Sequence, residues 1–169
     1  MRSDFLVYEA KSFYNAYIAL EQLSKADTTT ELLLYAPMVV NGSFSIELTL
    51  KAILVKNHIS YGKEHNLLVL FRLLPKPFQD ELLTHLIEKA PEYINPEKCV
   101  EELVLLSNAF VDWRYAFEDN PAPAIDSRFL SAFANTLCSV HDGDLILRHQ
   151  FLAGFLIIQA IGVVGGTGF

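Results

Sequence analysis

The chain has 169 residues, a net charge of −7 and 51% hydrophobic residues, which predicts one acidic domain with a sizeable core and excludes a disordered chain. Two cysteines exclude a disulfide scaffold, and the charged residues at positions 4, 9 and 11 interrupt the apolar run of a signal peptide, so we expect a cytoplasmic protein. The acidic balance disfavours a broad phosphate-binding surface but leaves room for a small basic cluster that contacts RNA.

The mean hydropathy of +0.27 is unevenly distributed along the chain. Residues 150–169 hold no charged side chain and five of the eight glycines, and they supply roughly two-thirds of the positive hydropathy. They are long enough to span a bilayer, although glycines weaken a helix. We therefore predict a domain at 1–141 and an apolar, Gly-rich tail at 142–169. The tail is a segment packed at a dimer interface, a membrane anchor, or a departure from the natural reading frame.

Helical patterns dominate the sequence. Apolar residues three and four positions apart predict an amphipathic helix over Ser12–Lys25. A break follows at Asp27–Thr30, whose threonines can cap the next helix. That helix is longer and runs to about Asn57, and Pro37 and Gly42 mark a bend in it or its true start.

The best part of this second helix is residues 43–57, where apolar positions nearly surround the axis. This pattern predicts the central, most buried helix of the protein. Two short helices follow at 65–75 and 75–91, and the prolines between them fix a corner. Pro96 suits the first turn of another helix, which continues to about residue 119.

A last helix is predicted over Ile125–Val140, with Asp126 or Ser127 as its N-cap. No alternating strand pattern longer than four residues is found. The fold class is therefore all-α, an up-and-down bundle of five or six antiparallel helices.

Signatures of the common enzyme classes are missing from the sequence. It has no P-loop, dinucleotide glycine pattern, zinc-binding Cys/His array or nucleophile elbow. Glu81, His85 and Glu88 share one helical face, but a carboxylate-bridged metal site needs a matching set from a second helix, and none is found. We interpret the three as an exposed polar face, and we expect neither a metal ion nor a cofactor.

Two charged residues in the central helix are candidates for ligand contact. Glu47 and Lys51 form a favourable i,i+4 pair in otherwise apolar surroundings. Because burial of an isolated charge is costly, the two either pair at the surface, which is the favoured interpretation, or lie at a cleft or interface.

A second candidate segment, Asp112–Asp119, contains the only tryptophan. Arg114 lies between Trp113 and Tyr115, and a guanidinium group there can bind phosphate or stack on a base. The alternative is a structural ion pair with a neighbouring carboxylate, packed beside core aromatics.

In this order and at these separations, SIELTLKAIL, EHNLLVLFRLLP and FVDWRYAFE resemble the HEPN domain (higher eukaryotes and prokaryotes nucleotide-binding) over roughly Phe5–Val140. The resemblance implies a bundle of four or five helices that is usually paired as a homodimer. Many HEPN proteins are metal-independent endoribonucleases of toxin–antitoxin, phage-defence and RNA-processing systems. Others are inactive partners of nucleotidyltransferases, or ligand-sensing modules. The implied partners are a second copy, RNA or a nucleotide, and an antitoxin or a nucleotidyltransferase.

Active family members carry an Arg, a polar residue and then a His four to six residues beyond the Arg, and this His acts on the ribose 2′-hydroxyl and phosphate. Arg114 matches in position, but Tyr115 follows it and positions 119–121 are Asp-Asn-Pro. Asp119 can accept a proton but is a poor acid at neutral pH, because an exposed aspartate is already ionised. His65 is the one histidine in the resembling segments; it caps the following helix, which is favoured, or faces a dimer cleft.

The sequence thus predicts a HEPN-like dimerisation module with weak or absent catalysis. It would contact RNA, a nucleotide or a partner protein in a prokaryotic toxin–antitoxin or defence system. One alternative is a metal-independent endoribonuclease that uses Arg114 with Asp119 or His65. Another is a membrane-tethered effector anchored by residues 150–169. The ligand-contact candidates are Glu47, Lys51, Trp113 and Tyr115.

Overall fold

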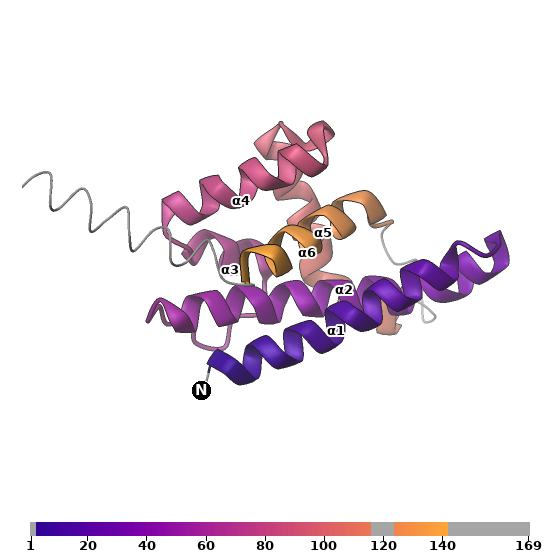
Figure 1. The fold of residues 1–169 in the computed structure, drawn as a ribbon, viewed down its shortest axis with the longest axis horizontal. Coiled ribbons are helices and arrows are strands. Elements are labelled where there is room, and N and C mark those ends of the chain that lie inside the picture. The colour runs from indigo at the N-terminus through magenta and orange to yellow at the C-terminus, as the bar shows by residue number, and fades with distance from the viewer. Residues whose placement is uncertain (1–2, 116–123, 142–169) are drawn as a thin grey trace, which may run out of the picture.

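The structure is a computed structural model that describes residues 3–115 and 124–141, with side chains described up to residue 109 and over residues 124–139. These residues form six α-helices, one 3₁₀ turn and no strand, which confirms the all-α prediction (Figure 1). The elements are α1 (Ser3–Ser24), α2 (Thr28–Lys56), α3 (Leu67–Leu73), α4 (Lys76–Lys89), η1 (Pro91–Tyr93), α5 (Pro96–Tyr115) and α6 (Ser127–His141). The predicted tail at 142–169 lies outside the described residues.

Helices α1 and α2 form a long hairpin and lie side by side in Figure 1. The first helix begins at Ser3, so the predicted start at Ser12 is wrong. The reason is tertiary: Leu6 and Ala10, one turn apart, are buried against Leu48 and Ala52 in the second half of α2. The extra turns of α1 are therefore stabilised by packing on a segment much later in the chain.

Helix α2 runs unbroken through 29 residues. Its N-cap is Asp27, whose carboxylate accepts hydrogen bonds from the Thr30 backbone N–H at 2.9 Å and from its hydroxyl at 2.8 Å, and not a threonine as predicted. These bonds also lower the pKa of Asp27. Pro37 lies inside the helix, so neither Pro37 nor Gly42 is its true start.

As predicted, the segment around residues 43–57 is the central part of the bundle. Buried side chains of α2 run from Met38 to Leu54, and α1, α3, α5 and α6 all pack against this helix. A Cβ atom at Gly42 would lie 2.8 Å from Leu130 Cδ1, so glycine permits the close approach of α6. By length and composition α2 is the one helix of the described chain that could cross a membrane, and 67% of its apolar window is buried, as in a core helix.

The last helix, α6, packs against the core through aromatic rings. Phe129 of α6 makes an edge contact with Tyr93 of η1, with ring centroids 5.0 Å apart, and stacks on Phe133 at 5.4 Å. Phe133 in turn meets Phe71 of α3 at 6.2 Å. These contacts join η1, α3 and α6 in one core, which is the arrangement a bundle requires.

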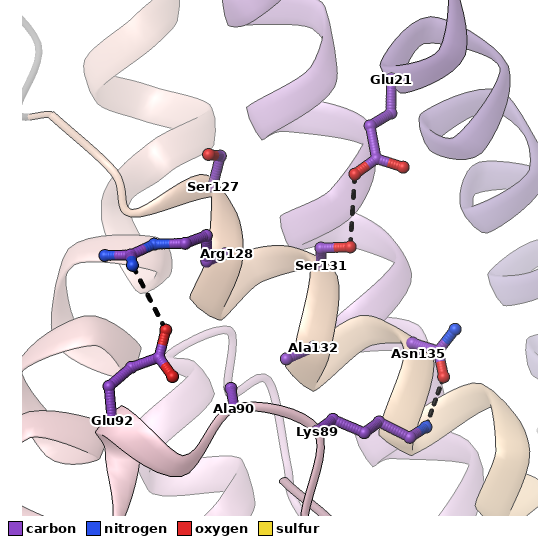
Figure 2. Close-up of a pocket in the computed structure, with 9 residues that line it drawn as sticks. All are labelled: Glu21, Lys89, Ala90, Glu92, Ser127, Arg128, Ser131, Ala132 and Asn135. Carbon is purple, nitrogen blue, oxygen red and sulfur yellow. Dashed lines mark hydrogen bonds and ion pairs between the residues drawn. The ribbon is translucent and has the colours of Figure 1, made fainter. Parts of the chain in front are cut away.

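Two neighbouring hollows open on the surface beside α6. One, of about 450 Å³, lies between α1, the end of α4, η1 and α6, and Figure 2 shows its lining residues. The other, of about 400 Å³, lies beside the α1–α2 turn. Glu21 and Ser127 line both, so the two hollows adjoin.

Candidate functional site

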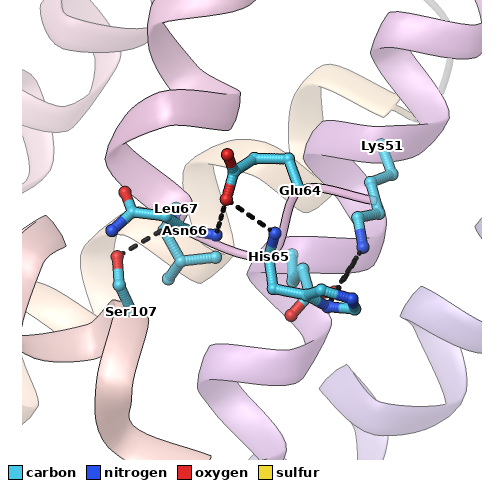
Figure 3. A network of polar contacts seen from close by, with 7 residues as sticks. Lys51, Glu64, His65, Asn66, Leu67 and Ser107 are labelled. Carbon is cyan, nitrogen blue, oxygen red and sulfur yellow. Dashed lines mark hydrogen bonds and ion pairs between the residues drawn. The ribbon is translucent and has the colours of Figure 1, made fainter. Parts of the chain in front are cut away.

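Three residues singled out in the sequence converge in the structure (Figure 3). The Lys51 ammonium donates a hydrogen bond of 2.6 Å to Glu47 Oε1, and His65 Nδ1 lies 2.9 Å from the same oxygen. Lys51 Nζ and His65 Nδ1 are 3.4 Å apart. We call this group the Glu47–Lys51–His65 cluster. It joins the second half of α2 to the turn before α3.

The ion pair of this cluster is largely buried. The side chains of Lys51 and Glu47 are 8% and 13% exposed, so the predicted surface pair is wrong. The pair is enclosed because α2 is the central helix and because the turn after it brings His65 and Tyr61 across it. Lys51 Nζ lies 5.3 Å from the centroid of the Tyr61 ring, a cation–π contact that compensates part of the desolvation cost.

The turn that carries His65 is held by its own polar contacts. Glu64 Oε1 accepts hydrogen bonds from the backbone N–H groups of Asn66 at 2.7 Å and of His65 at 2.9 Å, and both lower the pKa of Glu64. Asn66 Oδ1 accepts the Val69 N–H at 3.0 Å and is the N-cap of α3. The predicted cap role of His65 is therefore wrong: His65 precedes the cap, and its ring reaches Glu47 instead.

Helix α5 lies next to this cluster. Ser107 Oγ accepts the Leu67 N–H at 2.9 Å and donates to the Leu103 carbonyl at 2.6 Å. A small cavity of about 20 Å³, enough for one water molecule, lies between Glu47, Leu67 and Ser107. The site is thus formed where α2, the start of α3 and α5 meet.

The other predicted site residues lie at the end of α5 and after it. Position 114 lies on α5, seven residues after Ser107. The side chains of Trp113, Arg114 and Tyr115 lie outside the described part of the structure, as does the whole of Asp119.

Sequence reasoning missed three contributors to this site. Tyr61, Glu64 and Ser107 cover the ion pair, fix the turn and tie it to α5, respectively. Glu64 had a usable signal, because an acidic residue just before a helix start often accepts backbone N–H groups. Tyr61 and Ser107 had none, since their roles depend on contacts between distant segments.

A second polar group lies where η1 meets the start of α6. The Tyr93 hydroxyl donates to Asp126 Oδ2 at 2.5 Å, and Arg128 also binds this carboxylate at 3.2 Å. Burial alone would raise the pKa of Asp126, but these hydrogen bonds lower it. The pKa of the nearby Glu102 carboxyl shifts in the opposite direction, because burial, and then the Asp126 charge, raise it. Glu102 Oε2 is buried and has no hydrogen-bond partner.

The chemistry available at the Glu47–Lys51–His65 cluster is proton transfer. Glu47 contacts Nδ1 of His65, so an Nδ1–H tautomer leaves Nε2 as the acceptor, and 72% of the His65 side chain is exposed. Lys51 compensates the Glu47 charge. Among the side chains that the structure describes, no three His, Cys, Asp or Glu residues are grouped as metal ligands.

Fold and site together define a helical bundle whose central helix buries an ion pair beneath an exposed histidine. Residues 16–128 match the HEPN domain family. Because this match spans more than half of the 169 residues, the chain belongs to the HEPN domain family. Neither a curated protein nor a solved structure matches the chain significantly.

Proposed function

We propose that this HEPN domain is a cytoplasmic, homodimeric module that contacts RNA or a nucleotide, with weak or absent cleavage of its own. The observation that carries the proposal is the segment after Arg114, where positions 118–121 are Glu-Asp-Asn-Pro and hold no histidine of the kind that active members carry. Without that residue the standard acid–base group is missing. An antitoxin or a nucleotidyltransferase in a prokaryotic toxin–antitoxin or defence system is the partner protein that the family suggests.

In this proposal the buried pair acts through the exposed histidine. Glu47 and Lys51 are too enclosed to bind a large ligand directly, so they are positioning residues that fix the His65 ring. An exposed imidazole can stack on an unpaired base or donate a hydrogen bond to phosphate. Arg114, with Trp113 and Tyr115 beside it, would supply the second contact to RNA.

The test combines binding, cleavage and mass on the full chain. Labelled single-stranded RNA is titrated by fluorescence anisotropy and incubated in EDTA, and the mass is measured by analytical ultracentrifugation. We expect a dimer of twice the 19.0 kDa chain mass, saturable RNA binding and little or no cleavage. Arg114→Ala and His65→Ala should each weaken binding several-fold.

A matched control is His85→Ala, because His85 is a half-exposed histidine that also pairs with a carboxylate, Glu88 at 3.0 Å, but lies on α4. It should bind RNA like the unchanged chain. A monomer without RNA affinity, or equal binding by all variants, would contradict the proposal.

The second candidate is a metal-independent endoribonuclease in which His65 replaces the missing histidine. The observation that favours it is the contact between Glu47 and His65 Nδ1, because a carboxylate that orients an imidazole is a common arrangement for acid–base catalysis. Cleavage in EDTA that is lost in Arg114→Ala and His65→Gln, with a pH profile that His65→Gln abolishes, would establish the enzyme and overturn the non-catalytic proposal.

A further inference from the structure

The hollow of about 450 Å³ is an open, shallow groove with α6 as its floor (Figure 2). One stripe of α6, from Arg128 through Ser131 and Ala132 to Asn135, lines it at helical spacing. Glu21 of α1 forms one wall, and the end of α4 with η1 forms the other. Its volume lies within the range of small-molecule sites.

Most charges in this lining are neutralised by the protein itself. Glu21 pairs with Lys25 at 3.9 Å and accepts a hydrogen bond from Ser131 at 3.3 Å. The Arg128 guanidinium lies 3.4 Å from Glu92, in addition to its contact with the Asp126 carboxylate. These groups can still exchange hydrogen bonds with a ligand, but they do not require a counter-ion.

Lys89 is different, because its hydrogen-bond partners are neutral. Its ammonium donates to Asn135 Oδ1 and, at 3.1 Å, to Ser139 Oγ. The adjacent carboxylate, Glu88, pairs with His85 instead. Within the described residues no carboxylate forms an ion pair with Lys89. Burial lowers the pKa of Lys89, and the electrostatic contributions of Cys138 and Glu88 offset only part of this effect. A bound anion would satisfy the remaining N–H group and favour the charged form.

From this groove we infer a binding site for a phosphate monoester of a small polyol, with the phosphate on Lys89 and the hydroxyl groups along Ser131, Ser127 and Glu21. Asn135, which Lys89 contacts, lies about one helical turn after Ser131, or about 6 Å along α6. That spacing suits a phosphate and a hydroxyl at opposite ends of a sugar-sized molecule. The site lies apart from the Glu47–Lys51–His65 cluster and does not depend on RNA contact.

The lining also indicates what the ligand is not. Its nine residues include no aromatic ring on which a nucleobase could stack, and Ala90 and Ala132 supply the small apolar area. A cationic ligand is disfavoured, because the carboxylates of Glu21 and Glu92 already pair with Lys25 and Arg128. Hydroxyl groups, by contrast, match the serine, amide and carboxylate groups of the groove.

The experiment measures binding of three probes to the full chain by titration calorimetry: ribose 5-phosphate, inorganic phosphate and ribose. We expect saturable binding of ribose 5-phosphate, weaker binding of phosphate and none of ribose. Lys89→Gln should weaken ribose 5-phosphate binding by about tenfold, the effect of one lost charged contact. Ala132→Leu, which places a larger side chain on the floor, should abolish it.

The matched control is Lys76→Gln, since Lys76 is also on α4 but is exposed and pairs with Asp80 at 2.8 Å outside the groove. It should leave binding unchanged. Circular dichroism checks that each variant is folded, and Lys89→Gln alone decides the outcome if Ala132→Leu does not fold. Absence of saturable binding, equal binding in Lys89→Gln, or equal affinity for phosphate and ribose 5-phosphate would overturn the inference.

Discussion

At the scale of single residues, the burial of Lys51 explains how a charged side chain can occur in the most apolar helix. Its ammonium has three neighbours, the Glu47 carboxylate, the His65 ring and the Tyr61 ring, which replace the lost water. Such a pair adds little net stability by comparison with an apolar pair, but removal of one partner strands the other.

Lys51→Met is therefore expected to destabilise the protein by on the order of 2 kcal/mol, because Glu47 keeps a buried charge without its cation. The measurement is the free energy of unfolding in urea. Lys76→Met removes an exposed pair with the same i,i+4 spacing and should change stability by less than about 0.5 kcal/mol. If the two variants lose equal stability, the pair does not behave as buried.

Glu102→Gln should increase stability at neutral pH. Burial and the Asp126 charge raise the pKa of Glu102 in the folded state above 4.5, the ordinary value for a glutamate. The folded protein therefore keeps the Glu102 proton to a higher pH than the unfolded chain does. The folded state is then favoured at low pH, and this advantage is lost as the pH rises through the folded-state pKa. Gln carries no charge, so the variant should gain over the unchanged chain as the pH increases. Melting curves from pH 4 to pH 7 test this, and a constant difference would refute it.

At the scale of elements, the end of α2 controls where His65 lies. The Ile59 N–H bonds to the Leu54 carbonyl at 2.9 Å and the His58 N–H to the Val55 carbonyl at 3.0 Å, a Schellman motif. Its C′ residue, His58, has φ of 58°, a left-handed conformation that favours glycine. The turn after α2 therefore contains backbone strain close to the site.

His58→Gly is expected to stabilise the fold by about 0.5 to 1 kcal/mol, because glycine adopts the left-handed conformation without a Cβ penalty. Thermal unfolding should show a higher midpoint, and RNA binding should be unchanged because the turn keeps its shape. His58→Ala is the control, since alanine retains the strain. A midpoint for glycine no higher than that for alanine would contradict the prediction, and lower midpoints for both variants than for the unchanged chain would show that the imidazole itself holds the turn.

The helices were predictable because apolar periodicity is local. The helix ends, and the burial of the Glu47–Lys51 pair, were not predictable. Leu6 and Ala10 gave no strong local signal, and the partners that make them helical lie on α2. The i,i+4 spacing of Glu47 and Lys51 predicted the pairing but not the burial, which depends on the turn at 57–66 folding back over α2. Meeting points of distant segments, including the groove at Lys89, are therefore the part that sequence reasoning missed.

At the scale of the whole molecule, the folded bundle extends beyond the family match. The match spans residues 16–128, but α1 begins at Ser3 and α6 continues to His141. The added segments are part of the core, since Leu6 is 1% exposed and Phe133 and Leu137 are fully buried. Within the described residues, α6 packs against α1, α2 and α4.

A chain that ends at His149 should therefore fold like the full chain, with the same helical content and a melting temperature within about 2 °C, because it retains every described core contact. Circular dichroism in detergent-free buffer provides the measurement for both chains. If only the full chain requires detergent, residues 150–169 anchor the protein in a membrane. If only the shortened chain becomes monomeric in ultracentrifugation, those residues pack at a dimer interface. A shortened chain that fails to fold would contradict the prediction, since the core would then depend on residues beyond α6.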